Sequence, residues 1–150
     1  MEQTFVMIKP DGVQRGLTGE IISRIERKGL RIVAMRMCQV TDETARRHYA
    51  EHVEKPFFNS LIEFITSSPA VPMIAEGADA VSVMRTIAGA TDPKDALVGT
   101  IRGDFGLDVG RNLIHSADSL ESAKREIEIH FTEGDMVLYE KAEEAWVYSQ

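Results

Sequence analysis

The sequence holds a single cysteine, Cys38, among its 150 residues. One thiol cannot form an internal disulfide, so we expect a reducing, cytoplasmic location and a small core residue in the apolar run around Cys38. No run approaches the roughly 18 consecutive apolar residues that a membrane-spanning helix needs. The N-terminus has an acidic second residue and an early Pro10-Asp11-Gly12 break, unlike a secretory signal. We expect no membrane partner.

Basic residues are also in deficit. The chain carries 17 Lys and Arg against 24 Asp and Glu, for a formal net charge of -7. Nucleic-acid binding relies on neutralising phosphates with Lys and Arg, so this balance argues against a nucleic-acid partner. It leaves room for a small basic pocket inside an acidic protein. A hydrophobic content of 43% excludes disordered and collagen-like classes.

Repeats, low-complexity tracts and linkers are missing too, so we read residues 1–150 as one domain. Hydrophobic patterning predicts strands at residues 4–8, 31–40, 71–75 and 112–115. It predicts helices at residues 18–28, 56–68 and 80–88, one starting at Thr41-Asp42, and one starting at Asp118 or Ser119. If the smaller predicted helices are left out, the order of elements is βαββαβ. That order is typical of a ferredoxin-like α+β fold, a four-stranded antiparallel sheet with helices on one face.

The usual nucleotide fingerprints are absent. The chain has no GxxxxGK[ST] loop, no GxGxxG after a strand and no HRD segment of protein kinases. It does have five glycines in the irregular stretch 89–110, with Arg102, Arg111 and Asn112 close by. Glycine lets backbone approach a ligand, and the arginine fork matches phosphate oxygens. The stretch is therefore either a phosphate-binding loop or one whose glycines only turn the chain.

Histidines offer two candidate sites. His48 and His52 form an i, i+4 pair on an expected helix, but no third zinc ligand is visible, so we expect that pair to face solvent. His115 ends a predicted strand, and Glu126 follows eleven residues later in the next helix. If that helix folds back, the carboxylate reaches the imidazole, fixes its tautomer and leaves the other nitrogen as a nucleophile. The alternative is a core histidine bonded to a backbone carbonyl.

Four segments together resemble nucleoside diphosphate kinases: IKPDGVQRGLTGEIISRIERKGLRIVAM, HYAEHVEKPFF, GTIRGDF and VGRNLIHSADSLESAKREI. The resemblance runs from Thr4 to about Tyr148, with several motifs in the family's order. It implies a small ferredoxin-like α/β domain. It also implies transfer of the γ-phosphate of a nucleoside triphosphate to a nucleoside diphosphate, by a ping-pong reaction through a phosphohistidine with little base selectivity.

The resemblance also assigns roles by position. His115 matches the phosphorylated histidine and Glu126 the carboxylate that orients it. The positions that match phosphate- and ribose-holding residues are Lys9, Tyr49, Arg85, Thr91, Arg102 and Asn112. Phe57 and Leu61 match the apolar clamp on the base, with Val109 opposite, although apolar residues at this spacing also fit a core. Mg²⁺ is expected to arrive with the nucleotide phosphates, and Asp118 matches a residue near it that acts through water.

The resemblance further implies a homo-oligomer, a hexamer rather than a tetramer. Residues 89–94 resemble the family's subunit-contact loop, and Trp146 and Tyr148 form an aromatic tail that must pack against something. One departure stands out. The family usually has Gly or Ala and then Ser after the histidine, whereas this chain has Ser116 and Ala117. The hydroxyl that normally bonds the orienting glutamate is missing, and Ser116, one place early, should point the other way. An alternative reading is therefore a relative that binds nucleotides without turnover.

Overall fold

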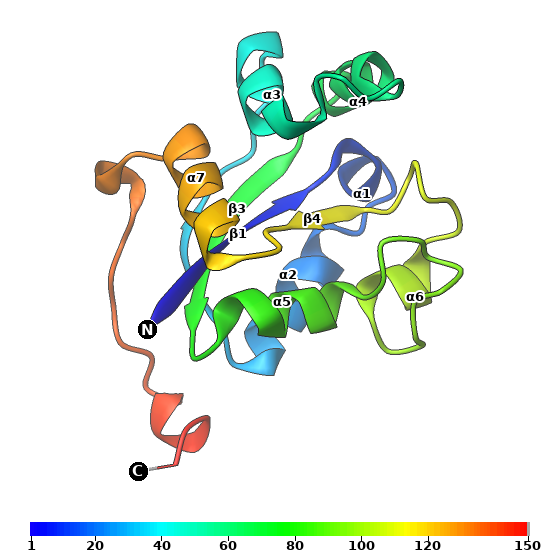
Figure 1. Cartoon of the computed structure of the whole chain (residues 1–150). Coiled ribbons are helices and arrows are strands. Elements are labelled where there is room, and N and C mark those ends of the chain that lie inside the picture. The colour runs from blue at the N-terminus through cyan, green and yellow to red at the C-terminus, as the bar shows by residue number, and fades with distance from the viewer. Residues whose placement is uncertain (150) are drawn as a thin grey trace.

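A four-stranded antiparallel sheet organises the molecule. In the computed structural model, which describes residues 1–149, the strands are β1 (Glu2–Ile8), β2 (Arg31–Met35), β3 (Val71–Gly77) and β4 (Ile114–Ser116). Their order in the sheet is β2-β3-β1-β4, and every pairing is antiparallel (Figure 1). The ferredoxin-like fold predicted from the sequence is confirmed. No helix within residues 1–149 is long and apolar enough to cross a membrane.

Helices cover both faces of this sheet. Alternate residues of β1 point to opposite faces, so Val6 and Ile8 join one core cluster while Phe5 and Met7 join the other. The first cluster packs beneath α2 (Thr18–Lys28) and α5 (Ala80–Ala88). The second is covered by α3 (Asp42–His48), α4 (Phe58–Thr66) and α7 (Leu120–His130). We expected helices on one face only, and α2 and α5 do lie there. The other face is equally apolar and must also be buried, so α3, α4 and α7 cover it.

Two strands have different bounds from those expected. The predicted strand over residues 31–40 ends at Met35, after a register shift between Ile32 and Ala34. Beyond Met35 the chain still runs beside the start of β3, where the Arg36 N–H donates to the Pro72 carbonyl. Pro72 has no N–H, so it cannot donate a hydrogen bond back and the regular strand pairing ends. The last strand begins at Ile114 rather than at residue 112, since Leu113 has a positive φ of 76° and cannot be extended.

Two short helices were missed by the sequence reading. Pro10-Asp11-Gly12, which the sequence marks as a break, opens α1 (Pro10–Gln14), where proline is tolerated because the first helical N–H needs no partner. Within the stretch 89–110, α6 (Ile101–Phe105) begins where the hydroxyl of Thr100 accepts the Gly103 N–H at 3.0 Å. Gly103 also lies against the Leu97 carbonyl, where any β-carbon would collide.

The other helix boundaries differ by small amounts. The segment starting at Thr41-Asp42 divides into α3 and a 3₁₀ turn at Ala50–His52, and α4 begins at Phe58 rather than at residue 56. Ser119 caps α7 by accepting the Ser122 N–H at 3.0 Å, as one of the two expected starts required. Cys38 is partly buried and packs against the second core cluster.

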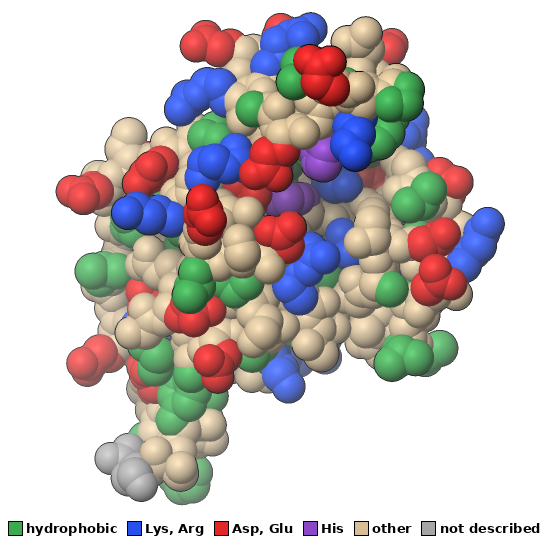
Figure 2. All heavy atoms as spheres, in the orientation of Figure 1, with side chains coloured by type: hydrophobic (Ala, Val, Ile, Leu, Met, Phe, Trp, Pro, Cys, Tyr) green, Lys and Arg blue, Asp and Glu red, His purple; other side chains and the backbone are tan. Residues whose placement is uncertain are grey.

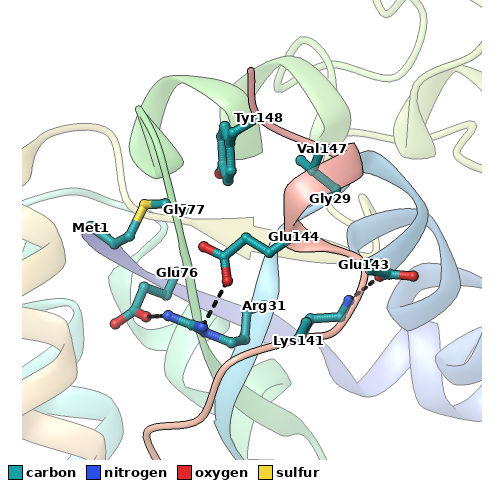
Figure 3. Close-up of a pocket in the computed structure, with 10 residues that line it drawn as sticks. All are labelled: Met1, Gly29, Arg31, Glu76, Gly77, Lys141, Glu143, Glu144, Val147 and Tyr148. Carbon is teal, nitrogen blue, oxygen red and sulfur yellow. Dashed lines mark hydrogen bonds and ion pairs between the residues drawn. The ribbon is translucent and has the colours of Figure 1, made fainter. Parts of the chain in front are cut away.

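The C-terminal segment runs past two 3₁₀ turns, Glu133–Asp135 and Glu144–Trp146, back to the sheet edge. There Arg31 pairs with Glu76 and, at 3.3 Å, with Glu144 (Figure 3). The Tyr148 hydroxyl accepts the Ala78 N–H at 2.9 Å. The expectation that the tail aromatics pack holds within this chain for Tyr148, whereas Trp146 is 90% exposed.

Candidate active site

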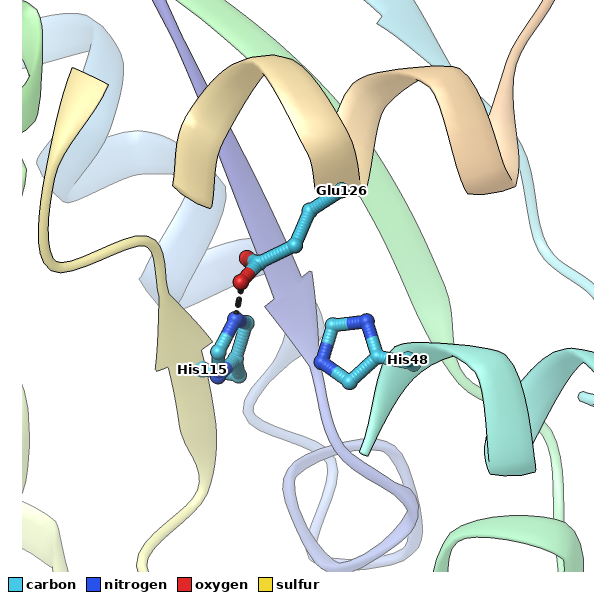
Figure 4. A group of neighbouring side chains, drawn as sticks. All are labelled: His48, His115 and Glu126. Atoms are coloured by element: carbon cyan, nitrogen blue, oxygen red, sulfur yellow. Dashed lines mark hydrogen bonds and ion pairs between the residues drawn. The ribbon is translucent and has the colours of Figure 1, made fainter. Parts of the chain in front are cut away.

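His115 and Glu126 meet as the sequence spacing suggested. His115 lies on the short edge strand β4 opposite Met7, and α7 folds back so that Glu126 reaches it. The distance from His115 Nε2 to Glu126 Oε1 is 2.6 Å (Figure 4). Glu126 is buried, whereas the His115 side chain is partly exposed. Since Nε2 is engaged, Nδ1 is the ring nitrogen left free for chemistry.

A second histidine, His48, packs edge-on against His115. Their ring centroids are 4.6 Å apart with an interplanar angle of 77°. The expectation that His48 faces solvent is wrong: it is 3% exposed, because α3 lies across the sheet and turns its last residue inward. His48 Nδ1 lies 3.0 Å from Nε2 of His130, whose ring stacks on Phe5.

Burial keeps these two supporting histidines neutral. It lowers the pKa of His48 well below its usual value, with further lowering by the neighbouring His115, His130, Arg125 and Lys9. Burial, followed by the charge of His115 and nearby arginines, lowers the pKa of His130 to about 3. Near pH 7 His115 therefore sits against uncharged rings.

Basic side chains gather beside this cluster. Lys9 Nζ donates to Asn112 Oδ1 at 2.8 Å, and burial together with the Arg102 charge lowers the pKa of Lys9 to about 8. Burial and the charge of Arg85 lower the pKa of Arg102 to about 10. Hydrogen bonds place all three basic side chains beside the segment 112–116: Lys9 bonds the Asn112 side chain, Arg85 the Ser116 carbonyl and Arg102 the Ile114 carbonyl. Figure 2 shows histidine side chains in a hollow bordered by basic and acidic groups.

Arg102 has a use that the sequence did not indicate. The residue is 3% exposed, and its guanidinium donates to the backbone carbonyls of Asn112, Gly89 and Ile114, at 3.2, 2.9 and 2.6 Å. Arg102 thus ties the glycine-rich stretch to the start of β4.

Two further bonds hold the loops around the site. The Asn112 side-chain amide donates to the Thr91 carbonyl at 2.9 Å, so Asn112 connects Lys9 to the loop at residues 89–94. Arg85 donates to the Ser116 carbonyl at 3.0 Å, one residue beyond His115. These contacts place both side chains beside the histidine strand.

Two pockets divide the predicted site residues between them. A cavity of about 840 Å³ is lined by Lys9, Phe57, Leu61, Thr91, Val109 and Asn112. A smaller one of about 120 Å³ is lined by Tyr49, Arg85, His115, Asp118 and Glu126. Arg102 lines neither of these two pockets and is buried. Phe57 and Val109 are 49% and 54% exposed, so neither is a core residue.

Several neighbours were missed by sequence reasoning. His48 packs against His115 and His130 packs against His48, and the Asp11 carboxylate accepts the Leu113 N–H at 3.0 Å, fixing the turn before β4. Arg111, which the sequence had placed beside the glycine-rich stretch, lies over the Phe64 ring at 4.1 Å on the wall of the larger cavity. The i, i+4 histidine spacing was a visible signal for His48, but it did not reveal which way the helix faces.

Some buried hydroxyls have no partner within residues 1–149. Tyr49 Oη and Ser116 Oγ are two of them. Burial raises the pKa of Tyr49 above its ordinary value, so its phenol stays protonated and can donate to a ligand in the smaller pocket. The orphaned Ser116 hydroxyl confirms that it does not replace the missing bond to Glu126. Ala117 is fully buried against Val81 and Ala123.

The smaller pocket fits a magnesium ion carried by phosphates. Mg²⁺ bound with a nucleotide takes one or two protein carboxylates and keeps several waters. Asp118 is exposed, lines this pocket together with His115, and is engaged in no ion pair among the described residues. It would hold the ion, directly or through water.

Comparison with known proteins identifies the family to which this fold belongs. The model of the family described as nucleoside diphosphate kinase matches residues 2–136. The nucleoside diphosphate kinase of Archaeoglobus fulgidus is 59% identical over 150 residues, covering 100% of this chain and 99% of that protein. That of Methanosarcina mazei is 60% identical over 148 residues, covering 99% of both.

Solved structures agree. A halophilic nucleoside diphosphate kinase from Halobacterium salinarum in complex with CDP superposes with a TM-score of 0.96 at 50% identity, covering 99% of both chains. A family protein from Babesia bovis gives 0.96 at 44% identity, covering 99% of this chain and 100% of that chain. The fold and these matches define a nucleotide-binding phosphotransferase enzyme. The chain belongs to the nucleoside diphosphate kinase family.

Proposed function

We propose that this chain transfers the γ-phosphate of a nucleoside triphosphate to a nucleoside diphosphate in two half-reactions, through a phosphohistidine at His115. The observation that carries the proposal is the 2.6 Å bond from His115 Nε2 to the buried Glu126. An acceptor carboxylate fixes the proton on Nε2, so the lone pair resides on Nδ1. Because donor and acceptor nucleotides visit the site in turn, one domain spanning residues 1–150 is enough.

The covalent step requires no proton transfer. The Nδ1 lone pair attacks the terminal phosphorus, the new N–P bond forms, and the bond to the bridging oxygen breaks. Its electron pair leaves with the nucleoside diphosphate. The phosphorylated ring, still protonated on Nε2, carries positive charge, and the Glu126 carboxylate stabilises that charge at hydrogen-bond distance. The second nucleotide then takes the phosphate by the reverse path.

Positive charge and positioning supply the rest. Phosphoryl transfer passes through a loose transition state with charge spread on its equatorial oxygens. Lys9 lines the larger cavity and Arg85 lines the smaller pocket, and both are proposed to contact those oxygens. Arg102 holds the surrounding backbone. Tyr49 lines the smaller pocket, with its unpartnered hydroxyl available for the same task.

The remaining nucleotide contacts fall in the larger cavity. Thr91 and Asn112 lie on its wall beside Lys9, where they are proposed to hold ribose and phosphate. Phe57 and Leu61 on one side and Val109 on the other are proposed to clamp the base. Stacking on an aromatic ring accepts any base, so we expect broad base specificity.

Asp118 is proposed to hold Mg²⁺ together with the nucleotide phosphates. A bound magnesium ion there would neutralise phosphate charge.

Isotope labelling tests the function directly. Incubation with ATP labelled at its γ-phosphate should place acid-labile, alkali-stable phosphate on the protein, and adding a second nucleoside diphosphate should remove it. His115→Ala should take no label, whereas the control His52→Ala should label normally, since His52 lines the same pocket but its ring contacts Tyr49 and Phe57 rather than His115. Label persisting in His115→Ala would falsify the assignment.

A second candidate is a relative that binds nucleotides without turnover. The one feature that favours it is Ala117 in place of the family's serine, which leaves Glu126 without a hydroxyl partner. Tight nucleotide binding with no phosphate exchange would support this reading. Because the His115–Glu126 bond forms without that hydroxyl, we favour the active enzyme.

We also propose a homo-oligomer, a hexamer rather than a tetramer, in the cytoplasm. Exposed apolar side chains support an assembly: Leu97, Val98 and Leu107 follow the loop at residues 89–94, and Trp146 projects from the tail. The unpaired Cys38 fits a reducing compartment. Sedimentation across a concentration series tests the assembly, and a monomer at every concentration would contradict it.

A further inference from the structure

Three side chains from distant parts of the chain bring potential metal ligands to one point. The ligand atoms of His48, His115 and Glu126 all lie within 4.8 Å of one another. Figure 4 shows these side chains converging from α3, β4 and α7. The sequence offers no third ligand next to the pair His48 and His52, whereas the fold brings potential partners to His48 from two other elements.

The orientation of His48 suits a ligand. Its Nδ1 is engaged with Nε2 of His130 at 3.0 Å, so Nε2 is the nitrogen left for the cluster. Figure 4 shows that a ring nitrogen of His48 faces His115. Metal-binding histidines almost always donate their other N–H to a fixed acceptor, and His130, locked by stacking on Phe5, provides one.

We propose that His48, His115 and Glu126 form a binding site for a divalent transition-metal ion of the zinc class, and that metal bound there blocks phosphate transfer. Two imidazoles and a carboxylate are a set that zinc takes with a water in the fourth position. Magnesium prefers oxygen ligands and near-ideal octahedral geometry, so this site discriminates against it. The proposed activating ion, magnesium, and the proposed blocking ion, zinc, would therefore bind to different sets of ligands.

The surroundings leave room for the ion. Zinc with bonds of about 2.0–2.2 Å holds neighbouring ligand atoms about 3.3 Å apart. The His115–Glu126 pair, now at 2.6 Å, must open by some tenths of an ångström. The adjoining pocket has a volume of about 120 Å³, enough for a water ligand. Its wall carries the carboxylates of Glu51, Asp118 and Glu126 against the guanidinium groups of Arg85 and Arg125.

The blocking effect rests on the proposed function and follows from the tautomer of His115. A metal on Nε2 uses the lone pair of that nitrogen, so the ring proton leaves Nε2 and is carried by Nδ1 instead. A protonated Nδ1 has no lone pair with which to attack phosphorus. Glu126 is at the same time withdrawn from its bond to the ring. The larger cavity is untouched, so we expect zinc to lower kcat while leaving the nucleotide KM unchanged.

Zinc binding is measured first, without nucleotide, by competition with a chromophoric zinc indicator. His48→Gln should weaken zinc binding by at least about tenfold, because an amide is a poor zinc ligand. His52→Gln is the matched control, since His52 lines the same pocket outside the cluster, and it should bind zinc normally. Equal zinc affinity of His48→Gln and the unmodified protein would overturn the site.

A further variant protects the test against misfolding of His48→Gln. His130→Phe keeps a ring stacked on Phe5 but removes the acceptor for His48, and it should weaken zinc binding about tenfold. Unchanged zinc affinity of a folded His130→Phe would contradict the proposed role of that acceptor, and with it the site.

Phosphate exchange is then assayed with saturating magnesium and buffered free zinc. At about ten times the zinc Kd, kcat of the unmodified protein should fall about tenfold by mass action, and His48→Gln should resist the same zinc concentration. Zinc binding through His48 with undiminished kcat would overturn the blocking role. The control is protein that has been freed of zinc and is assayed with magnesium alone. If it shows no phosphate exchange, the proposed function is refuted, and the zinc-binding measurement still tests the metal site independently.

Discussion

Removing the charge of Glu126 while keeping its shape is the sharpest probe of the proposed chemistry. Glu126→Gln preserves side-chain volume in a position that is 4% exposed. Its amide oxygen can still accept the Nε2–H of His115, so the ring keeps its orientation. What is lost is the negative charge at 2.6 Å from a ring that becomes cationic when phosphorylated. The variant therefore separates orientation from charge stabilisation.

The size of the effect follows from the bond that is weakened. A hydrogen bond to a charged group contributes about 1.5–3 kcal/mol, against about 0.5–1.5 kcal/mol for a neutral one. The difference of about 1–2 kcal/mol acts in the transition state, and each 1.36 kcal/mol is about tenfold in rate. We expect kcat for phosphate exchange to fall about 5–30-fold, with little change in the nucleotide KM.

Rapid-mixing measurement of phosphoprotein formation from ATP isolates the first half-reaction. Glu128→Gln is the control, since it is an exposed glutamate on the same helix whose side chain lines a different pocket. It should phosphorylate at the unmodified rate. If Glu126→Gln does the same, charge stabilisation by Glu126 is refuted. A loss confined to KM would show that Glu126 acts in nucleotide binding instead.

Three further expectations can be tested with simple assays. Ala117→Ser supplies the hydroxyl that, by the family resemblance, bonds the orienting Glu126, and should raise the exchange rate about fivefold or the free energy of unfolding by about 1 kcal/mol; no change in either would contradict this. Because the pKa of Lys9 is lowered to about 8, its charge is present below that pH and lost above it. Nucleotide affinity should therefore fall about tenfold between pH 7 and pH 9, and a flat titration profile would exclude Lys9 as a phosphate contact. Arg102→Lys loses two or more charge-assisted bonds to buried carbonyls and should reduce the free energy of unfolding in urea by about 3 kcal/mol; a loss below about 1 kcal/mol would contradict that role.

Local chemistry explains what could be predicted. The short apolar run at residues 4–8 and the Ser119 cap act through neighbours in sequence, so their elements were found. The bounds were less secure where a distant residue decides them. Pro72 cannot bond the strand predicted to reach residue 40, and nothing near residue 40 signals that. The helix α6 was missed because its cap lies inside a glycine-rich stretch typical of loops.

The sequence by itself indicated the family and the four-stranded sheet, and through the family resemblance it paired His115 with Glu126, a contact that the structure shows at 2.6 Å. Only the tertiary structure decided the surroundings of that pair. The burial of His48 and the engagement of Arg102 with three carbonyls depend on how α3 and the stretch 89–110 pack across the sheet. Such contacts join residues far apart in the chain, and helical or strand periodicity carries no information about which of them will meet.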